Sequence, residues 1–225
     1  MTIMPTASHR WVFWTLTLLG LAVDQGAKYC IFAGLYEAAM ADTREHTGHI
    51  VVVPDTFHIV ARFDPSDHPD RNPDRDFLAP LRVWGGRMQP GVNEGALFGI
   101  GQGNNLMFAA ISIAAALFIM GWSMRSTAGR DGFLCVALGL ILAGTLGNLY
   151  DRVVFSGVRD FLHWFRWYNW PVFNIADICL VFGAGMLLLE AFFRKPADQP
   201  ANLTSLADDR IAGGYPPDAK SVAGS

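Results

Sequence analysis

Long apolar stretches alternate with polar segments along this chain, and the pattern predicts its main elements. A helix that crosses a bilayer needs about 20 predominantly apolar residues. Four stretches come close to that length, and they are residues 11–36, 105–122, 133–150 and 173–193. We therefore expect four transmembrane helices, with both ends of the chain on the same side of the membrane.

The first apolar stretch admits a second interpretation. Residues 1–23 could form a secretory signal, with Arg10 ahead of an apolar core. However, no small-x-small cleavage site is well placed there, and the helical pattern continues past Asp24 to Tyr36. We therefore favour a membrane span.

A different pattern occupies two parts of the segment 37–104, between the first and second spans. Residues 50–63 and 81–100 are rich in β-branched and aromatic residues, around a Pro-Asp turn in the first and a Gly-Gly turn in the second. Such runs predict short strands. The expected fold is thus an all-α integral membrane protein of four transmembrane helices with a small β-rich extracytoplasmic cradle.

Two segments are too polar to build a core of their own. Residues 64–80 are proline-rich and polar, and they predict a surface insertion within about residues 64–91. Residues 196–225 consist of proline, glycine, alanine and polar residues, which predicts a disordered cytoplasmic tail. The four-helix membrane domain should therefore comprise residues 1–195.

Composition and charge support a membrane protein and give it an orientation. Charged residues make up 16% of the chain, against about 25% in soluble domains. The net charge is only -3 and no long basic run is present, so a nucleic-acid partner is not expected. Cytoplasmic loops are enriched in Lys and Arg. The basic residues that flank the spans are Arg10, Arg125, Arg130, Arg194 and Lys195, and they predict cytoplasmic termini.

Polar side chains gather near the outer ends of the spans. Asp24 and Lys28 are four residues apart and share a helix face, so they could form a local ion pair, contact a substrate, or both. Asp151 and Arg152 end the third span, and an interfacial ion pair is the simplest interpretation of the two.

Asp160 and Asp177 have fewer obvious partners. Asp160 lies in an aromatic segment, and Asp177 lies one turn into the fourth span, where a charge is costly and marks a pathway or a reaction. If the two meet, desolvation and like charge raise one pKa and the pair shares a proton. One carboxylate can then activate water while the other donates to a carbonyl, as in aspartic proteases. Spacing alone does not bring them together.

Other chemistries fit less well. No HExxH or GxSxG motif is present, and the first span has no serine to pair with Lys28. Cys179 with His163 is a weak candidate for a thiol–imidazole pair. The histidines of the outer loop, which are His46, His49 and His58, could bind a metal, but scattered loop histidines are more often solvated. We expect no metal and no cofactor.

Four polar motifs resemble, in order, those of the lipoprotein signal peptidases (signal peptidase II). They are VDQGAK (23–28), VNEGALFGI (92–100), GNLYDRV with VRDF (147–153 and 158–161) and FNIAD (173–177). The resemblance covers roughly residues 11–195. It departs from the family in the inserted residues 64–91 and in the long tail.

The resemblance implies a function and a set of site residues. The catalytic pair would be Asp160 and Asp177, and Asp151 would be structural. Supporting or substrate-binding residues would be Asp24, Lys28, Asn93, Asn148, Arg152 and Asn174. The activity implied is cleavage of lipid-modified prolipoproteins just before the diacylglyceryl cysteine, without a metal or a covalent intermediate, by a monomer that contacts lipids in the bacterial inner membrane.

Two other functions remain open from the residues alone. A small proton-coupled transporter could use Asp177 as a proton relay. A structural membrane protein could use the same polar residues to bind lipid headgroups, and its function would then survive replacement of Asp177 by asparagine.

Overall fold

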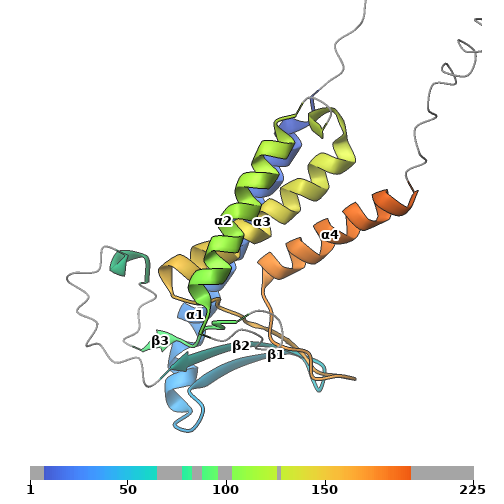
Figure 1. The fold of residues 1–225 in the computed structure, drawn as a ribbon. Coiled ribbons are helices and arrows are strands. Elements are labelled where there is room, and N and C mark those ends of the chain that lie inside the picture. The colour runs from blue at the N-terminus through green and yellow to red at the C-terminus, as the bar shows by residue number, and fades with distance from the viewer. Residues whose placement is uncertain (1–7, 65–77, 83–87, 96–102, 126–127, 194–225) are drawn as a thin grey trace, which may run out of the picture. The chain divides into compact units, whose positions relative to one another are not determined.

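The computed structural model describes residues 8–64, 78–82, 88–95, 103–125 and 128–193 (Figure 1). Its helices are α1 (Arg10–Ala41), α2 (Asn105–Ser123), α3 (Gly132–Val154) and α4 (Ile175–Phe193). The four predicted helical stretches are therefore confirmed as helices. The predicted tail, residues 196–225, lies outside the described residues, as does most of the predicted insertion.

Three of the described helices, α2, α3 and α4, are long and apolar enough to cross a membrane. The helix α1 does not belong to this set, so the fourth span stays a prediction. With 32 residues, α1 is about 48 Å long, which exceeds the roughly 30 Å of a bilayer's hydrocarbon core. Asp24 and Lys28 lie on its buried face, which lowers its hydropathy without placing charge on its surface.

The helix α3 is the most deeply buried, because α1 and α2 both pack against it (Figure 1). Small residues allow these close approaches. A Cβ atom added at Gly139 would lie 2.9 Å from the Phe13 carbonyl oxygen of α1. The apolar core there includes Phe13, Leu138 and Leu142. By contrast, α2 and α4 expose large apolar side chains such as Phe118 and Phe182, as lipid-facing helices do.

An antiparallel sheet packs against the end of α1. Its strands are β1 (Thr47–Val53), β2 (Phe57–Asp64), β3 (Gln89–Pro90) and β4 (Leu162–Trp164), and β2 pairs with the other three. Alternate residues of β2, Ala61 and Phe63, are buried against Phe32 and Leu35 of α1. The strands β1 and β2 confirm the two short strands that the β-branched and aromatic residues of 50–63 predict.

The second predicted strand region, 81–100, is only partly extended. Residues Ala79–Arg82 form a 3-10 helix, and the described residues of this region pair through the short β3 and a bridge between Asn93 and Val158. Residues 83–87 and 96–100 lie outside the described part. Two described parts of the predicted insertion contact α1: the Tyr29 hydroxyl donates to the Leu81 carbonyl, and the Met88 N–H donates to the Tyr36 hydroxyl over 3.2 Å.

The strand β4 was not predicted, and it connects the sheet to α4. The Val60 N–H donates to the Phe161 carbonyl over 2.9 Å, and Leu162 exchanges two backbone hydrogen bonds with Phe173. The segment between α3 and α4 is therefore held by the sheet on one side and runs directly into α4 on the other.

Candidate active site

Asp160 and Asp177 are joined by one residue, Asn174. The Asn174 side-chain amide donates to Asp160 Oδ1 over 2.6 Å. The Asn174 backbone N–H donates to Asp177 Oδ2 over 3.2 Å. The structure therefore brings together the two aspartates, which spacing alone left apart.

The start of α4 orients Asp177 through two hydrogen bonds with Asn174. Asn174 precedes the first helical residue, and its Oδ1 accepts the Asp177 N–H over 3.0 Å. Together with the bond from the Asn174 N–H back to the Asp177 carboxylate, this is a reciprocal capping box. The spacing N-x-x-D at the head of an apolar run carries this signal in the sequence.

Two further asparagines complete the hydrogen-bonding set. The Asn93 amide donates to Asp160 Oδ2 over 3.1 Å, and the Asn148 amide donates to Asp177 Oδ1 over 2.8 Å. Asn148 Oδ1 also accepts from the Asn174 amide over 3.3 Å. The three predicted asparagines and two aspartates thus form one continuous hydrogen-bonded chain.

Backbone pairing brings Asn93 to this position. Its N–H and carbonyl exchange bonds of 2.8 and 2.9 Å with Val158, two residues before Asp160. Its Oδ1 accepts the Gly95 N–H over 3.0 Å, which orients the amide toward Asp160. A Cβ added at Gly157 would lie 2.7 Å from a methyl of Val92, so only glycine allows the two segments this approach.

Burial and charge shift the acidity of Asp160. Burial, and next the negative charge of Asp177, raise the pKa of Asp160 to about 7. Hydrogen bonds from Asn174 and Asn93 and the charge of Lys28 act in the opposite direction. Near neutral pH the Asp160 carboxyl is therefore close to half protonated, which suits a group that gives and takes protons.

Arg152 does not pair with Asp151, so that prediction is wrong. The Arg152 guanidinium donates to the Gly95 carbonyl over 3.1 Å and lies 4.9 Å from the centre of the Phe108 ring. Asp151 instead forms ion pairs with Lys28 (3.3 Å) and Arg159 (2.8 Å). Residues 151 and 152 are about 100° apart around a helix, and this separates their partners.

A second polar cluster, whose four charged side chains are fully buried, lies beside the aspartates. Lys28 and Asp24 form the expected ion pair at 2.8 Å, and neither side chain is exposed. The cluster continues to Asp151 and to two residues that the sequence did not single out, Gln25 and Arg159. The available signal was the placement of Arg159 directly before Asp160, in an otherwise apolar run.

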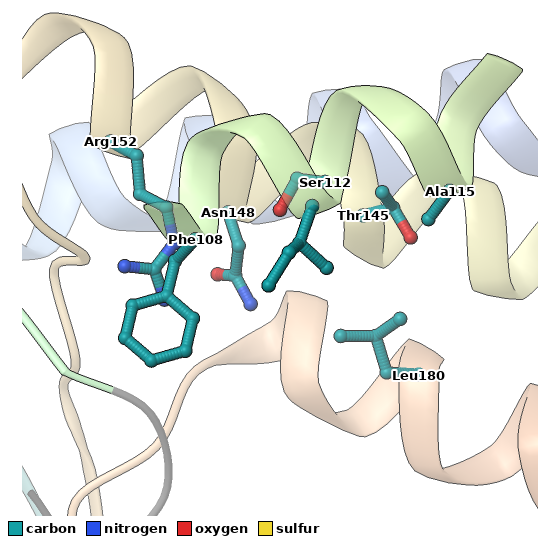
Figure 2. Close-up of a pocket in the computed structure, with 8 residues that line it drawn as sticks. Phe108, Ser112, Ala115, Thr145, Asn148, Arg152 and Leu180 are labelled. Atoms are coloured by element: carbon teal, nitrogen blue, oxygen red, sulfur yellow. The ribbon is translucent and has the colours of Figure 1, made fainter. Parts of the chain in front are cut away.

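A pocket of about 220 Å³ opens beside Asn148, between α2, α3 and α4 (Figure 2). Arg152, Phe108 and Asn148 lie at one end, and Ala115, Thr145 and Leu180 lie at the other. Asn148 connects it directly to Asp177. The pocket thus offers apolar space with polar groups at the end near the carboxylates.

Comparison with known proteins shows which family this sequence resembles. The signal peptidase (SPase) II family matches residues 81–193. The lipoprotein signal peptidase of Pseudomonas syringae pv. tomato is 33% identical over 205 residues, covering 89% of this chain and 97% of that protein. The one from Rhodopirellula baltica is 46% identical over 119 residues, covering 47% of this chain and 53% of that protein.

The fold is also found among solved structures. A bacterial membrane enzyme determined by the in meso method has a TM-score of 0.61 at 23% identity, covering 88% of this chain and 99% of that one. A helical membrane enzyme with a small antiparallel sheet is the class defined by fold and site. The chain belongs to the lipoprotein signal peptidase (signal peptidase II) family.

Membership of this family makes the protein a peptidase, hence a hydrolase, that processes lipoproteins. The family and the three apolar helices indicate a bacterial membrane protein. The comparisons give no support to the transporter. The roles of the individual site residues are not settled by membership and stay predictions.

Proposed function

We propose that this peptidase is of the aspartic type and removes signal peptides from diacylglyceryl-modified prolipoproteins, cutting before the lipidated cysteine. Asp160 and Asp177 are its catalytic pair. The single observation that carries the proposal is Asn174, whose amide and backbone N–H bond to both carboxyls. The pair lies at the start of α4, where an acyl-anchored substrate would present its peptide bond.

The reaction needs one proton shared between the two carboxyls. Asp160, with its pKa of about 7, holds the proton and donates to the scissile carbonyl. Asp177 is then the ionised partner and takes a proton from the attacking water, while Asn148 and the Asn174 N–H hold its carboxylate in place. When the tetrahedral intermediate collapses, the C–N bond breaks and the amine leaves with a proton from the pair.

A cleavage assay tests the function directly. The purified protein is reconstituted and given one prolipoprotein in its diacylglyceryl-modified form and in its unmodified form. We expect cleavage of the lipidated form alone, without added metal and in the presence of a chelator. Failure to cut either form, by protein shown to be folded, would contradict the peptidase; equal cleavage of both would contradict the lipid requirement.

The pH dependence of cleavage follows from the raised pKa of Asp160. Above pH about 7 the pair loses its remaining proton, so the rate should fall. Asn93→Ala removes a hydrogen bond that favours the ionised form of Asp160. The pKa of Asp160 should therefore rise, and the decrease in cleavage rate should begin at a higher pH than in the wild type. Rate profiles of both proteins between pH 5 and 9 check this, and a fall displaced to lower pH in the variant would contradict the sign.

The pocket should receive an apolar part of the substrate next to the scissile bond. Ala115→Phe fills its far end, so we expect KM for the lipidated substrate to rise about 10-fold or more while kcat changes less. Ala114→Phe is the matched control, because Ala114 is exposed on the same helix. Equal KM values for the two variants would show that substrate does not enter this pocket.

The orientation proposed is that of a four-span protein of the bacterial inner membrane with cytoplasmic termini and the sheet outside. It is supported by the basic residues at the inner ends, Arg10, Arg125 and Arg130. We expect a tag at residue 70 to react from outside, and tags at residues 127 and 210 to react only after permeabilisation. External labelling of residue 127 would overturn the orientation.

A further inference from the structure

Arg159 is a buried cation next to a candidate catalytic residue, and it does not line the pocket described above. Two nitrogens of its guanidinium donate to the Asp151 carboxylate over 2.8 and 3.3 Å. Its backbone N–H donates to the same carboxylate over 2.9 Å. A guanidinium nitrogen also donates to Gln25 Oε1 over 2.9 Å. Its planar face lies 3.9 Å from the Phe155 ring centre and 4.4 Å from that of Tyr29.

The same cluster reaches the other aspartate. Asp24 Oδ1 accepts the N–H of Ala176, the residue before Asp177, over 2.9 Å. The Gln25 amide donates to Asp24 over 3.0 Å and to Asp151 over 3.2 Å. Gln25 therefore links the two anions of the cluster.

The pattern is symmetrical in one respect. The residue immediately before each candidate catalytic aspartate is bonded to the same buried cluster, Arg159 before Asp160 and Ala176 before Asp177. The cluster is anchored in α1 and α3, two helices that pack closely. The cluster can therefore fix the distance between Asp160 and Asp177 without itself contacting the substrate.

We propose that Arg159 is a positioning residue of the reaction, which fixes Asp160 relative to Asp177 by way of Asp151 and Gln25. This inference rests on the proposed catalytic pair. Buried ion pairs often stabilise a fold no better than well-packed apolar residues. Catalytic groups, however, must be held within about 0.5 Å of their productive geometry. Three hydrogen bonds to one carboxylate supply that precision.

The charge of Arg159 matters as well as its shape. The buried cluster contains two carboxylates, Asp24 and Asp151, and two cations, Lys28 and Arg159, so its charges balance. Replacing Arg159 by a neutral residue leaves one negative charge uncompensated beside Asp160. That charge acts in the same direction as that of Asp177 and raises the pKa of Asp160 further.

The test compares Arg159→Gln with Arg159→Lys in the full-length, reconstituted protein. For Arg159→Gln we expect kcat to fall about 10- to 100-fold with KM little changed, since displaced catalytic groups cost rates of this order. The decrease in kcat above neutral pH should occur at a higher pH than in the wild type. Arg159→Lys keeps the positive charge but cannot bind the Asp151 carboxylate through two nitrogens. Its kcat should therefore fall, while the pH dependence of kcat should match that of the wild type.

Two further variants separate positioning from stability. Asp151→Asn with Arg159→Gln removes one charge of each sign, so its pH profile should return toward that of the wild type. Thr17→Val is the stability control, because Thr17 is buried and donates to the Gly139 carbonyl in the same bundle. It should lower the melting temperature without moving the pH profile.

The outcomes are distinguishable from failure of the proposed function. If Asp160→Asn still cleaves, the catalytic pair is wrong. If Asp160→Asn is inactive while Arg159→Lys and Arg159→Gln keep the wild-type kcat and pH profile, the pair stands and the positioning role is overturned. If Arg159→Gln does not fold, the rate and pH profile of Arg159→Lys and the charge-balanced double variant decide it.

Discussion

Asp160→Asn and Asp177→Asn should each abolish cleavage, with a loss of at least about 10³-fold in rate, while the protein remains folded in the membrane. Asparagine keeps the size of the side chain but can neither accept the proton of the attacking water nor donate to the carbonyl as an acid does, and general acid–base catalysis contributes on the order of 10²–10⁴-fold. Single-turnover cleavage of a lipidated substrate measures the loss.

The double variant gives a sharper test. Two groups that act as one unit lose nearly everything on the first substitution, so the double variant should be little slower than either single one. Asp55→Asn is the matched control, because Asp55 is exposed in the β1–β2 turn with φ 53°, a conformation that asparagine also adopts. Near-normal cleavage by either folded single variant would exclude the dyad.

Gly144→Ala should have the next largest effect, because Gly144 sets how closely α3 and α4 approach. A Cβ atom added there would lie 2.7 Å from Leu180 Cγ and would press on the Ala176 carbonyl. Real Cβ atoms do not come so close, so α4 must move away. Since Ala176 precedes Asp177, the Asn148–Asp177 hydrogen bond should be lost, and we expect about a 10²-fold fall in kcat with a lower melting temperature.

The control for this prediction is the same substitution at Gly185 of α4. Among the described residues, no atom beyond its own stretch of helix lies within 4 Å of the position that its Cβ would occupy. Alanine is favoured over glycine within a helix by about 0.5–1 kcal/mol, so Gly185→Ala should leave activity intact and stability equal or higher. Equal activity of Gly144→Ala and Gly185→Ala would show that this helix contact does not position Asp177.

Much of the local structure was predictable because it depends on neighbouring residues. Apolar runs of helical length predicted all four helices, and the β-branched and aromatic residues of 50–63 around a Pro-Asp turn predicted β1 and β2. The N-x-x-D spacing of Asn174 and Asp177 contains the capping box that holds Asp177. The strand β4 escaped prediction because three residues carry too little periodicity, and its extended form depends on pairing with β2.

The sequence by itself determined the helices, the first hairpin, and which polar side chains lie near the ends of the apolar runs. Only the tertiary structure decided which of them meet. Asn93 and Asp160 are 67 residues apart, and Gln25 and Arg159 are 134 apart. Periodicity encodes which face of an element is buried but not its partner. Glycines that let α1, α3 and α4 approach brought the distant partners together. The turn of the helix between residues 151 and 152 then directs Asp151 to Arg159 and separates it from Arg152.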